Sequence, residues 1–313
     1  MFSAALDKAT SLFERRFLIN AFFPSFIFCA LSVVVAIAGQ GNLGNAANAW
    51  NQQNTAFQIT TIVGFISLVT FFSGILASQI TTIVRLYEGY WNFPLSRYLK
   101  DISKSWYQDH LNELGERLDK NPKDPCYEEI YLNYPPPTRL EQVMPTRFGN
   151  ILKNAELYPL LRYQIDSVLI WPRLYNLFPE RFILTLAEAR SSFEFMLIIS
   201  FLGGAFALLS GIYLTLVGAT WWLFLLCFWG GLLVAWFAYE AALGSARLYA
   251  QQVKAAFDLY RNELLNQMRL PLPTDLKEER AQWKQIGQFL YSNLPGSWKY
   301  TNDEADSSGH KQP

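Results

Sequence analysis

Charged side chains are absent from two long parts of this chain, and this absence restricts the possible folds more than any other feature. Residues 17–84 contain no Asp, Glu, Lys or Arg. Between Arg190 and Arg247 only Glu194 and Glu240 are charged. A helix crosses a bilayer with roughly 20 apolar residues. Because a backbone in hydrocarbon has to satisfy its own hydrogen bonds, these blocks predict membrane-spanning helices.

Four spans fit these blocks, paired as two hairpins. They cover about residues 17–38, 57–83, 195–217 and 221–239. The linker of the first pair, GQGNLGNAANAWNQQN, carries no charge, and a very short loop joins the second pair. A cleaved signal peptide ending near the sequence AIAG is the alternative for the first span. Its apolar run is too long for a typical signal sequence, which favours an uncleaved anchor.

The basic side chains determine the predicted orientation. All 26 of them fall in residues 1–16, 85–190 and 247–313, so neither outer loop contains Lys or Arg. Basic residues are retained on the cytoplasmic side of a membrane. We therefore expect a multi-pass protein with both termini and the large middle region in the cytoplasm.

The predicted fold class is an all-α integral membrane protein, with four transmembrane helices extended into a cytoplasmic helical stalk. The predicted parts are a first hairpin at 1–92, a cytoplasmic helical domain at 93–178, a second hairpin with a long cytoplasmic extension at 179–270, a cytoplasmic helix at 271–300, and a disordered tail at 301–313. Helices are expected to run unbroken from an N-cap at Thr55 to Pro94, from Pro179 to Val217, and from Trp221 to the sequence MRLPLP.

Small and hydroxyl side chains recur at helical spacing on the second span. The stripe comprises Thr60, Gly64, Ser67, Thr70, Gly74, Ser78, Thr81 and Arg85. Small residues let membrane helices pack closely, which is the preferred interpretation. The alternative is a polar pathway with Arg85 at its inner mouth, although the stripe has no ring of acids of the kind used for ion selectivity.

Other polar residues in the spans have structural interpretations. Pro24 interrupts the first span, where Asn20 and Ser25 are placed to satisfy the backbone groups that it frees. The boundary carboxylates Glu194 and Glu240 lie near the inner membrane edge, within reach of arginines. We expect boundary ion pairs there, and a proton or cation site is the alternative.

The cytoplasmic middle region begins with an amphipathic helix after Pro94. One apolar stripe is predicted, made of Leu95, Leu99, Ile102, Trp106, Leu111, Leu114 and Leu118. Such a face has to dock on another element, most simply the stalk. The segment NPKDPCYEEIYLNYPPPT is expected to run extended as a wrapping linker, with a Pro-rich partner ligand as the alternative. Near the C-terminus, Thr274 is the predicted N-cap of a further helix.

The tract at residues 158–182, YPLLRYQIDSVLIWPRLYNLFPERF, is too charged and too rich in proline to be a span. We interpret it as an elbow at the inner leaflet. Its candidate lipid contacts are Arg162, Trp171, Arg173, Tyr175 and Arg181. The alternative is a core segment packed on the stalk, with Asp166 paired to an arginine.

Two blocks of the cytoplasmic sequence resemble a known pattern. The first comprises Thr146, Arg147, Gly149, Asn150, Ala155, Glu156, Tyr158, Arg162, Tyr163, Asp166, Trp171, Pro172, Arg173 and Leu174, and the second is FDLYRNELLNQMRLPLPTDLKEERAQW. Together they resemble an uncharacterised family of bacterial multi-span inner-membrane proteins. This resemblance implies a bacterial inner-membrane location and carries no activity or site residue with it.

No catalytic or ligand-binding motif stands out in the sequence. Its 2 histidines and 3 cysteines provide no nucleophile–histidine arrangement, metal-ligand spacing or disulfide framework. The 26 basic and 26 acidic residues give no net field for nucleic acid. We therefore expect a protein without enzymatic activity, cofactor or bound metal.

The functional hypothesis is a scaffold or signalling subunit. It would contact the lipid bilayer and bind a protein partner, or another copy of itself, through the cytoplasmic stalk. The alternatives are an oligomeric ion channel lined by the second span and a lipid-binding membrane protein.

Overall fold

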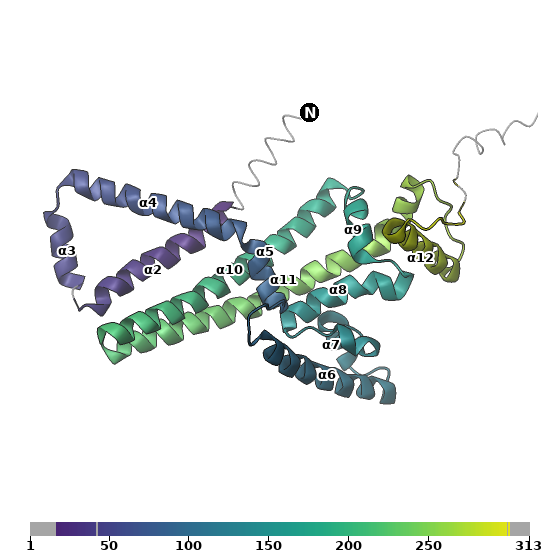
Figure 1. Ribbon diagram of the computed structural model, residues 1–313, viewed down its shortest axis with the longest axis horizontal. Coiled ribbons are helices and arrows are strands. Elements are labelled where there is room, and N and C mark those ends of the chain that lie inside the picture. The colour runs from purple at the N-terminus through teal and green to yellow at the C-terminus, as the bar shows by residue number, and fades with distance from the viewer. Residues whose placement is uncertain (1–16, 42, 299, 301–313) are drawn as a thin grey trace, which may run out of the picture. The chain divides into compact units, whose positions relative to one another are not determined.

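A computed structural model describes residues 17–41, 43–298 and 300, and helices account for most of them (Figure 1). The helices are η1 (Leu18–Phe22), α2 (Phe23–Gly39), α3 (Leu43–Gln52), α4 (Thr55–Ser78), α5 (Ile80–Glu88), α6 (Ser96–Lys120), α7 (Cys126–Asn133), η2 (Pro137–Gln142), α8 (Arg147–Tyr163), α9 (Ser167–Tyr175), α10 (Glu180–Val217), α11 (Trp221–Gln267) and α12 (Leu276–Ser292). The described residues contain no strand, so the all-α prediction is confirmed for them. The predicted disordered tail lies outside the described residues.

Four of these helices have the length and apolar composition needed to cross a membrane. They are the joined η1–α2 segment Leu18–Gly39, α4, α10 and α11. The helix of 38 residues, α10, and that of 47 residues, α11, are both longer than the roughly 20 residues that a bilayer requires. These features are those of a membrane protein with four spans.

The chain divides into two compact units. Met1–Pro94 and Arg190–Ser245 form the first, which we call the membrane unit. Leu95–Ala189 and Ala246–Pro313 form the second, the helical unit. Because α10 and α11 are longer than a span, each contributes residues to both units.

Close backbone packing joins α10 and α11 within the membrane unit, where the two helices run side by side (Figure 1). A Cβ atom on Gly231 would lie 2.9 Å from the carbonyl oxygen of Gly203 and 2.9 Å from the Cβ of Ala207. The Ser200 hydroxyl donates to the Ala235 carbonyl at 2.8 Å and accepts from the Tyr87 hydroxyl at 2.8 Å. Small residues and serine hydroxyls thus bring these helices together, as is usual in membrane bundles.

The first span begins with a π-helical turn, η1, followed by Pro24 in the first turn of α2. The side chain of Asn20 donates to the Ser191 hydroxyl on α10 at 2.8 Å. The Ser25 hydroxyl is buried and has no partner in the structure. The expectation that Asn20 and Ser25 satisfy backbone groups freed by Pro24 is therefore wrong. Pro24 lies inside the continuous helix Leu18–Gly39, directly after the π-helical turn, and a π-turn or a proline is a usual place for a helix to kink.

The second span is interrupted, contrary to the prediction of one helix from Thr55 to Pro94. Asn54 rather than Thr55 is the N-cap, and its side chain accepts from the Phe57 N–H. The ladder breaks at Gln79 between α4 and α5. Gly89, whose φ is 97°, then ends α5 before the proline is reached. The linker between the first two spans contains a helix of its own, α3.

The helical unit begins with α6, which packs on α7 and η2 with only part of its apolar surface. Leu111 and Leu114 are buried there. Leu99, Ile102 and Trp106 are exposed, so the prediction of one continuous docking face is wrong. From Trp106 to Leu111 the chain advances by five residues, which turns the side-chain direction by about 140° at 3.6 residues per turn.

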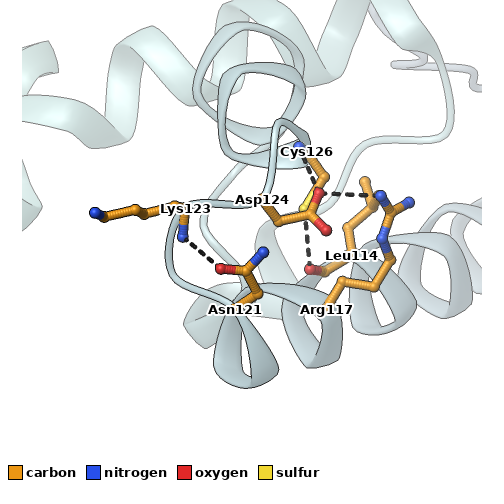
Figure 2. A network of polar contacts seen from close by, with 6 residues as sticks. All are labelled: Leu114, Arg117, Asn121, Lys123, Asp124 and Cys126. Carbon is orange, nitrogen blue, oxygen red and sulfur yellow. Dashed lines mark hydrogen bonds and ion pairs between the residues drawn. The ribbon is translucent and has the colours of Figure 1, made fainter.

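The turn between α6 and α7 is fixed by Asp124 (Figure 2). Its carboxylate accepts from the backbone N–H of Cys126 at 2.9 Å and from Arg117 at 3.0 Å. The Cys126 thiol donates to the Leu114 carbonyl at 3.7 Å. The hydrogen bond from the backbone N–H of Cys126 is the main reason that the pKa of Asp124 is lowered. The proline-rich segment forms α7 and η2 instead of the predicted extended linker. At the start of α7, Asp124 satisfies one of the backbone N–H donors.

Side-chain caps define three further helices of this unit. Thr146 caps α8 and accepts from the Gly149 N–H. Asp166 caps α9 instead of pairing with an arginine, as one interpretation of the sequence required. Asp275, rather than the predicted Thr274, caps α12, while Thr274 donates to Glu278. Trp283 and Ile286 are buried where α12 packs on α8 and α9.

A substitution at Gly231 tests the close packing of α10 and α11. Gly231→Val adds atoms where the Cβ alone already meets Ala207 and the Gly203 carbonyl, and overpacking of this kind costs ~1–3 kcal/mol. We expect a lower midpoint of thermal unfolding in detergent. Gly230→Val is the matched control, because a Cβ at Gly230 meets nothing within 4 Å. Equal destabilisation by both variants would contradict the packing.

A buried lysine, tyrosine and carboxylate cluster as the candidate functional site

Three ionisable residues on α11 lie at the spacing that brings side chains to one face of a helix. They are Lys254, Asp258 and Arg261, separated by four and three residues. Helix α8 provides two tyrosines to this face, α7 provides a third, and α12 provides a carboxylate. The resulting cluster, all within the helical unit, consists of Tyr131, Tyr158, Tyr163, Lys254, Asp258, Arg261 and Glu279. We call it the Asp258 cluster.

The carboxylate of Asp258 is held by two tyrosines from α8. Tyr158 donates its hydroxyl to one oxygen at 2.9 Å, and Tyr163 donates to the other at 2.6 Å. A hydrogen bond to an ionised group is stronger than one between neutral groups. Asp258 therefore fixes the position of α8 on α11 through both ends of its carboxylate.

Lys254 is almost completely buried, with 2% of its surface exposed. Its Nζ donates to the Tyr131 carbonyl at 2.8 Å. The same Nζ lies 4.0 Å from the centroid of the Tyr131 ring and 5.6 Å from that of Tyr158. Aromatic faces stabilise the ammonium at these distances.

Lys254 lies beyond the apolar part of α11, and its pKa is lowered to about 8. Burial is the main cause, because it disfavours the charged form. The positive charge of Arg162 adds to this effect, and the negative charge of Asp258 opposes it. The charge of this ammonium therefore changes near pH 8.

Arg261 connects α11 with α12. Its Nε lies 2.6 Å from a carboxylate oxygen of Glu279, and Nη1 donates to the carbonyl of Asp258. The guanidinium carbon also lies 4.1 Å from the centroid of the Tyr163 ring. Glu279 is itself buried. A buried ion pair with additional hydrogen bonds is costly to break, because either partner alone would be an uncompensated buried charge.

The two tyrosines that bind Asp258 are kept in the neutral form. Burial is the main cause that raises the pKa of Tyr163 to about 12 and that of Tyr158 still further. The hydrogen bond to Asp258 acts in the same direction, since only the protonated hydroxyl can donate. Both groups therefore serve as hydrogen-bond donors rather than as acids or bases at neutral pH.

Two of the residues predicted to contact lipid, Trp171 and Tyr175, take part in aromatic packing within the helical unit. The Trp171 ring lies 5.8 Å from Phe257 and 5.7 Å from Phe178, and Phe178 lies 5.7 Å from Tyr175. Trp171 thus packs on α11, as expected if the tract at residues 158–182 is a core segment.

The three predicted arginine contacts are exposed. Arg162 has its guanidinium 5.1 Å from the Tyr158 ring, and its carbonyl accepts from Arg280 at 2.8 Å. Arg173 donates to the Leu169 carbonyl of its own helix. Contact of Arg162, Arg173 or Arg181 with lipid stays a prediction.

The predicted stripe of the second span is exposed in the single chain. All of its residues from Thr60 to Arg85 lie on the surface. A Cβ on Gly64 or on Gly74 would meet nothing within 4 Å. The hydroxyl groups of Thr60, Ser67, Thr70 and Ser78 donate to carbonyls of their own helix. Intramolecular helix packing therefore does not account for the stripe.

The boundary carboxylates have different surroundings. Glu194 forms an ion pair with Arg190 at 2.7 Å, one turn earlier on α10. Glu240 is half-buried on α11. Neither residue belongs to a group of potential metal ligands among the described residues.

The sequence analysis missed Lys254, Asp258, Arg261 and Glu279. Their helical spacing was the available signal, but the partners of α11 on α8 are about a hundred residues away in sequence. In the structure, the two blocks that carry the family resemblance meet here. Tyr158 and Tyr163 belong to the first block, and Asp258 and Arg261 to the second.

Comparison with known proteins adds no assignment. No protein-family model, no curated protein and no solved structure matches this chain. The geometry of its own residues is therefore the basis for a functional proposal.

The pKa of Lys254 leads to a prediction for stability. Between about pH 8 and 10.5 the unfolded chain binds a proton that the folded chain has lost. The free energy of unfolding consequently rises with pH through this window, by about 2 kcal/mol between pH 7 and 9.5. Above the ordinary tyrosine pKa of 10.0, ionisation in the unfolded chain acts in the opposite direction, because Tyr163 and Tyr158 resist it in the fold.

The measurement is denaturant unfolding in detergent across this pH range at constant ionic strength. Lys254→Met should remove the rise between pH 7 and 9.5. Lys284→Met, which replaces an exposed lysine of α12, is the control and should retain it. The same pH dependence in wild type and Lys254→Met would show that the lysine is not the group responsible.

Proposed function

We propose that this chain is a non-enzymatic scaffold or signalling subunit of the bacterial inner membrane, acting through its helical unit in the cytoplasm. Both termini lie in the cytoplasm in this proposal, as the distribution of Lys and Arg favours. The observation that carries the proposal is an exposed apolar face on the first half of α6 and the residue before it. Its members, the α6 face, are Leu95, Tyr98, Leu99, Ile102 and Trp106.

The α6 face has the properties of a protein-binding surface. Its five residues lie within about 100° of arc at 3.6 residues per turn, and each is more than 40% exposed. Contiguous exposed apolar residues on a soluble surface mark interaction sites, and tryptophan and tyrosine are frequent in their energetic centres.

A protein fits this face better than an anionic membrane surface does. Arg97 and Lys104 lie on the opposite side of α6 at helical spacing, whereas Asp109 follows on the side of the face. Helices that bind membrane surfaces place lysine and arginine where they reach the headgroups. The proposed partner is therefore a protein with an apolar helix or groove.

The Asp258 cluster supports a structural role for the rest of the unit. Lys254 is bound by a carbonyl and two rings, Asp258 by two hydroxyls, and Arg261 by a carboxylate. Fully paired buried networks rigidify a fold. A rigid unit that presents one uncovered helix face is suited to docking.

Site-specific photo-crosslinking in native membranes tests this function. A photoreactive amino acid at Ile102 should give one discrete protein adduct, and the same amino acid at Arg97, exposed on the opposite side of α6, should not. Adding Trp106→Glu should reduce the Ile102 adduct by about tenfold, which corresponds to ~1.4 kcal/mol of binding free energy. Identical adducts at both positions, or lipid adducts alone, would contradict a partner at this face.

A second candidate function, an oligomeric ion channel, is favoured by the exposure of the stripe on α4 and α5. In such an assembly the stripes of several copies would face a common axis. Native mass spectrometry in nanodiscs should then show a ring of several copies, and liposomes should show ion flux that Ser67→Leu reduces. Leu68→Ile, at the exposed neighbouring position, is the control. A monomer without flux would exclude this function and leave the α6 proposal unaffected.

A further inference from the structure

An elongated apolar cleft lies within the membrane unit, between α2, α10 and α11. Its volume is about 570 Å³. Along α2 the lining extends from Phe23 to Ala38, a rise of roughly 22 Å at 1.5 Å per residue. Apolar side chains, glycines and the thiol of Cys227 make up the entire lining. The cleft therefore offers no strong hydrogen-bond donor or acceptor to a ligand.

The size and shape of the cleft indicate the kind of occupant. An apolar cavity of ~150 Å³ holds a benzene-sized molecule, so the cleft has room for a hydrocarbon roughly four times as large. A long and narrow hydrocarbon fits both the volume and the length of the cleft.

The cleft is continuous with the exposed apolar surface of the spans. Phe23, Ile27 and Val34 line it from α2, and Leu226 and Val234 line it from α11. Each of these five side chains is also more than 40% exposed. In a bilayer the mouth of the cleft consequently opens toward the acyl chains of the surrounding lipid.

We propose that this cleft binds one acyl chain of a bilayer phospholipid. The chain enters from the side, and the headgroup remains outside because the lining cannot solvate it. The close approach of Gly203 and Gly231 forms the floor, where the α10 and α11 backbones meet. At Gly230 the lining is open, since a Cβ there would meet nothing within 4 Å. This site is independent of the α6 face and of its partner.

Photolabelling in nanodiscs tests the site. The probe is phosphatidylcholine with a diazirine near the end of one acyl chain, and the labelled residues are mapped by mass spectrometry after irradiation. Labelling should concentrate on Phe28 and Cys227, which line the cleft, over Trp229 and Leu233, which are exposed on α11 outside it. Equal labelling of the two groups would overturn the proposal.

Filling the cleft is the second arm of the experiment. Gly230→Phe should reduce labelling of Cys227 by about tenfold, or ~1.4 kcal/mol of binding free energy. Gly204→Phe is the matched control, because Gly204 also has open space at its Cβ but does not line the cleft. Ile27→Trp fills the cleft from α2 and should act like Gly230→Phe. Unchanged labelling in both filled variants would overturn the proposal.

Discussion

Hydrocarbon provides no hydrogen-bonding partner for a polypeptide backbone, and most features of the membrane unit follow from this constraint. The spans are helices because only a helix satisfies its own N–H and C=O groups within one segment. Their hydroxyl groups obey the same constraint. Ser67 and Thr70 donate to carbonyls one turn earlier, so these two exposed hydroxyl groups find their acceptors within their own helix. The helices can then approach through glycine, as Gly203 and Gly231 do.

The sequence was sufficient to predict features that depend on composition. It was much less informative about features that depend on the side of a helix to which each side chain points. Charge-free length predicted the four spans, and the end of α11 near MRLPLP also agrees. The stripe on α6 was misjudged because Trp106 and Leu111 are five residues apart, a step that carries the apolar positions to another side of the helix. The predicted end at Pro94 was wrong because Gly89, in a left-handed conformation, ends α5 first.

The Asp258 cluster could not be predicted for a different reason. Each of its polar residues looks like part of a solvated helix face when the sequence is considered alone. Burial of Lys254 becomes apparent only when α7 and α8 cover α11, and this requires contacts across more than 90 residues of sequence. A spacing of three and four residues between ionisable groups was visible, but it is shared by many exposed helices.

Satisfied polar groups and uncovered apolar groups lie in different parts of the helical unit. Lys254, Asp258 and Arg261 are bound by protein groups, so changing them alters stability before it alters recognition. Ile102 and Trp106 are different, because they contribute little to the fold while they remain exposed. Burial of such side chains is worth ~1.5–3 kcal/mol each. A partner that covered the α6 face would gain this energy without reorganising the helical unit. Recognition at a preformed surface is therefore the physically simplest use of this fold.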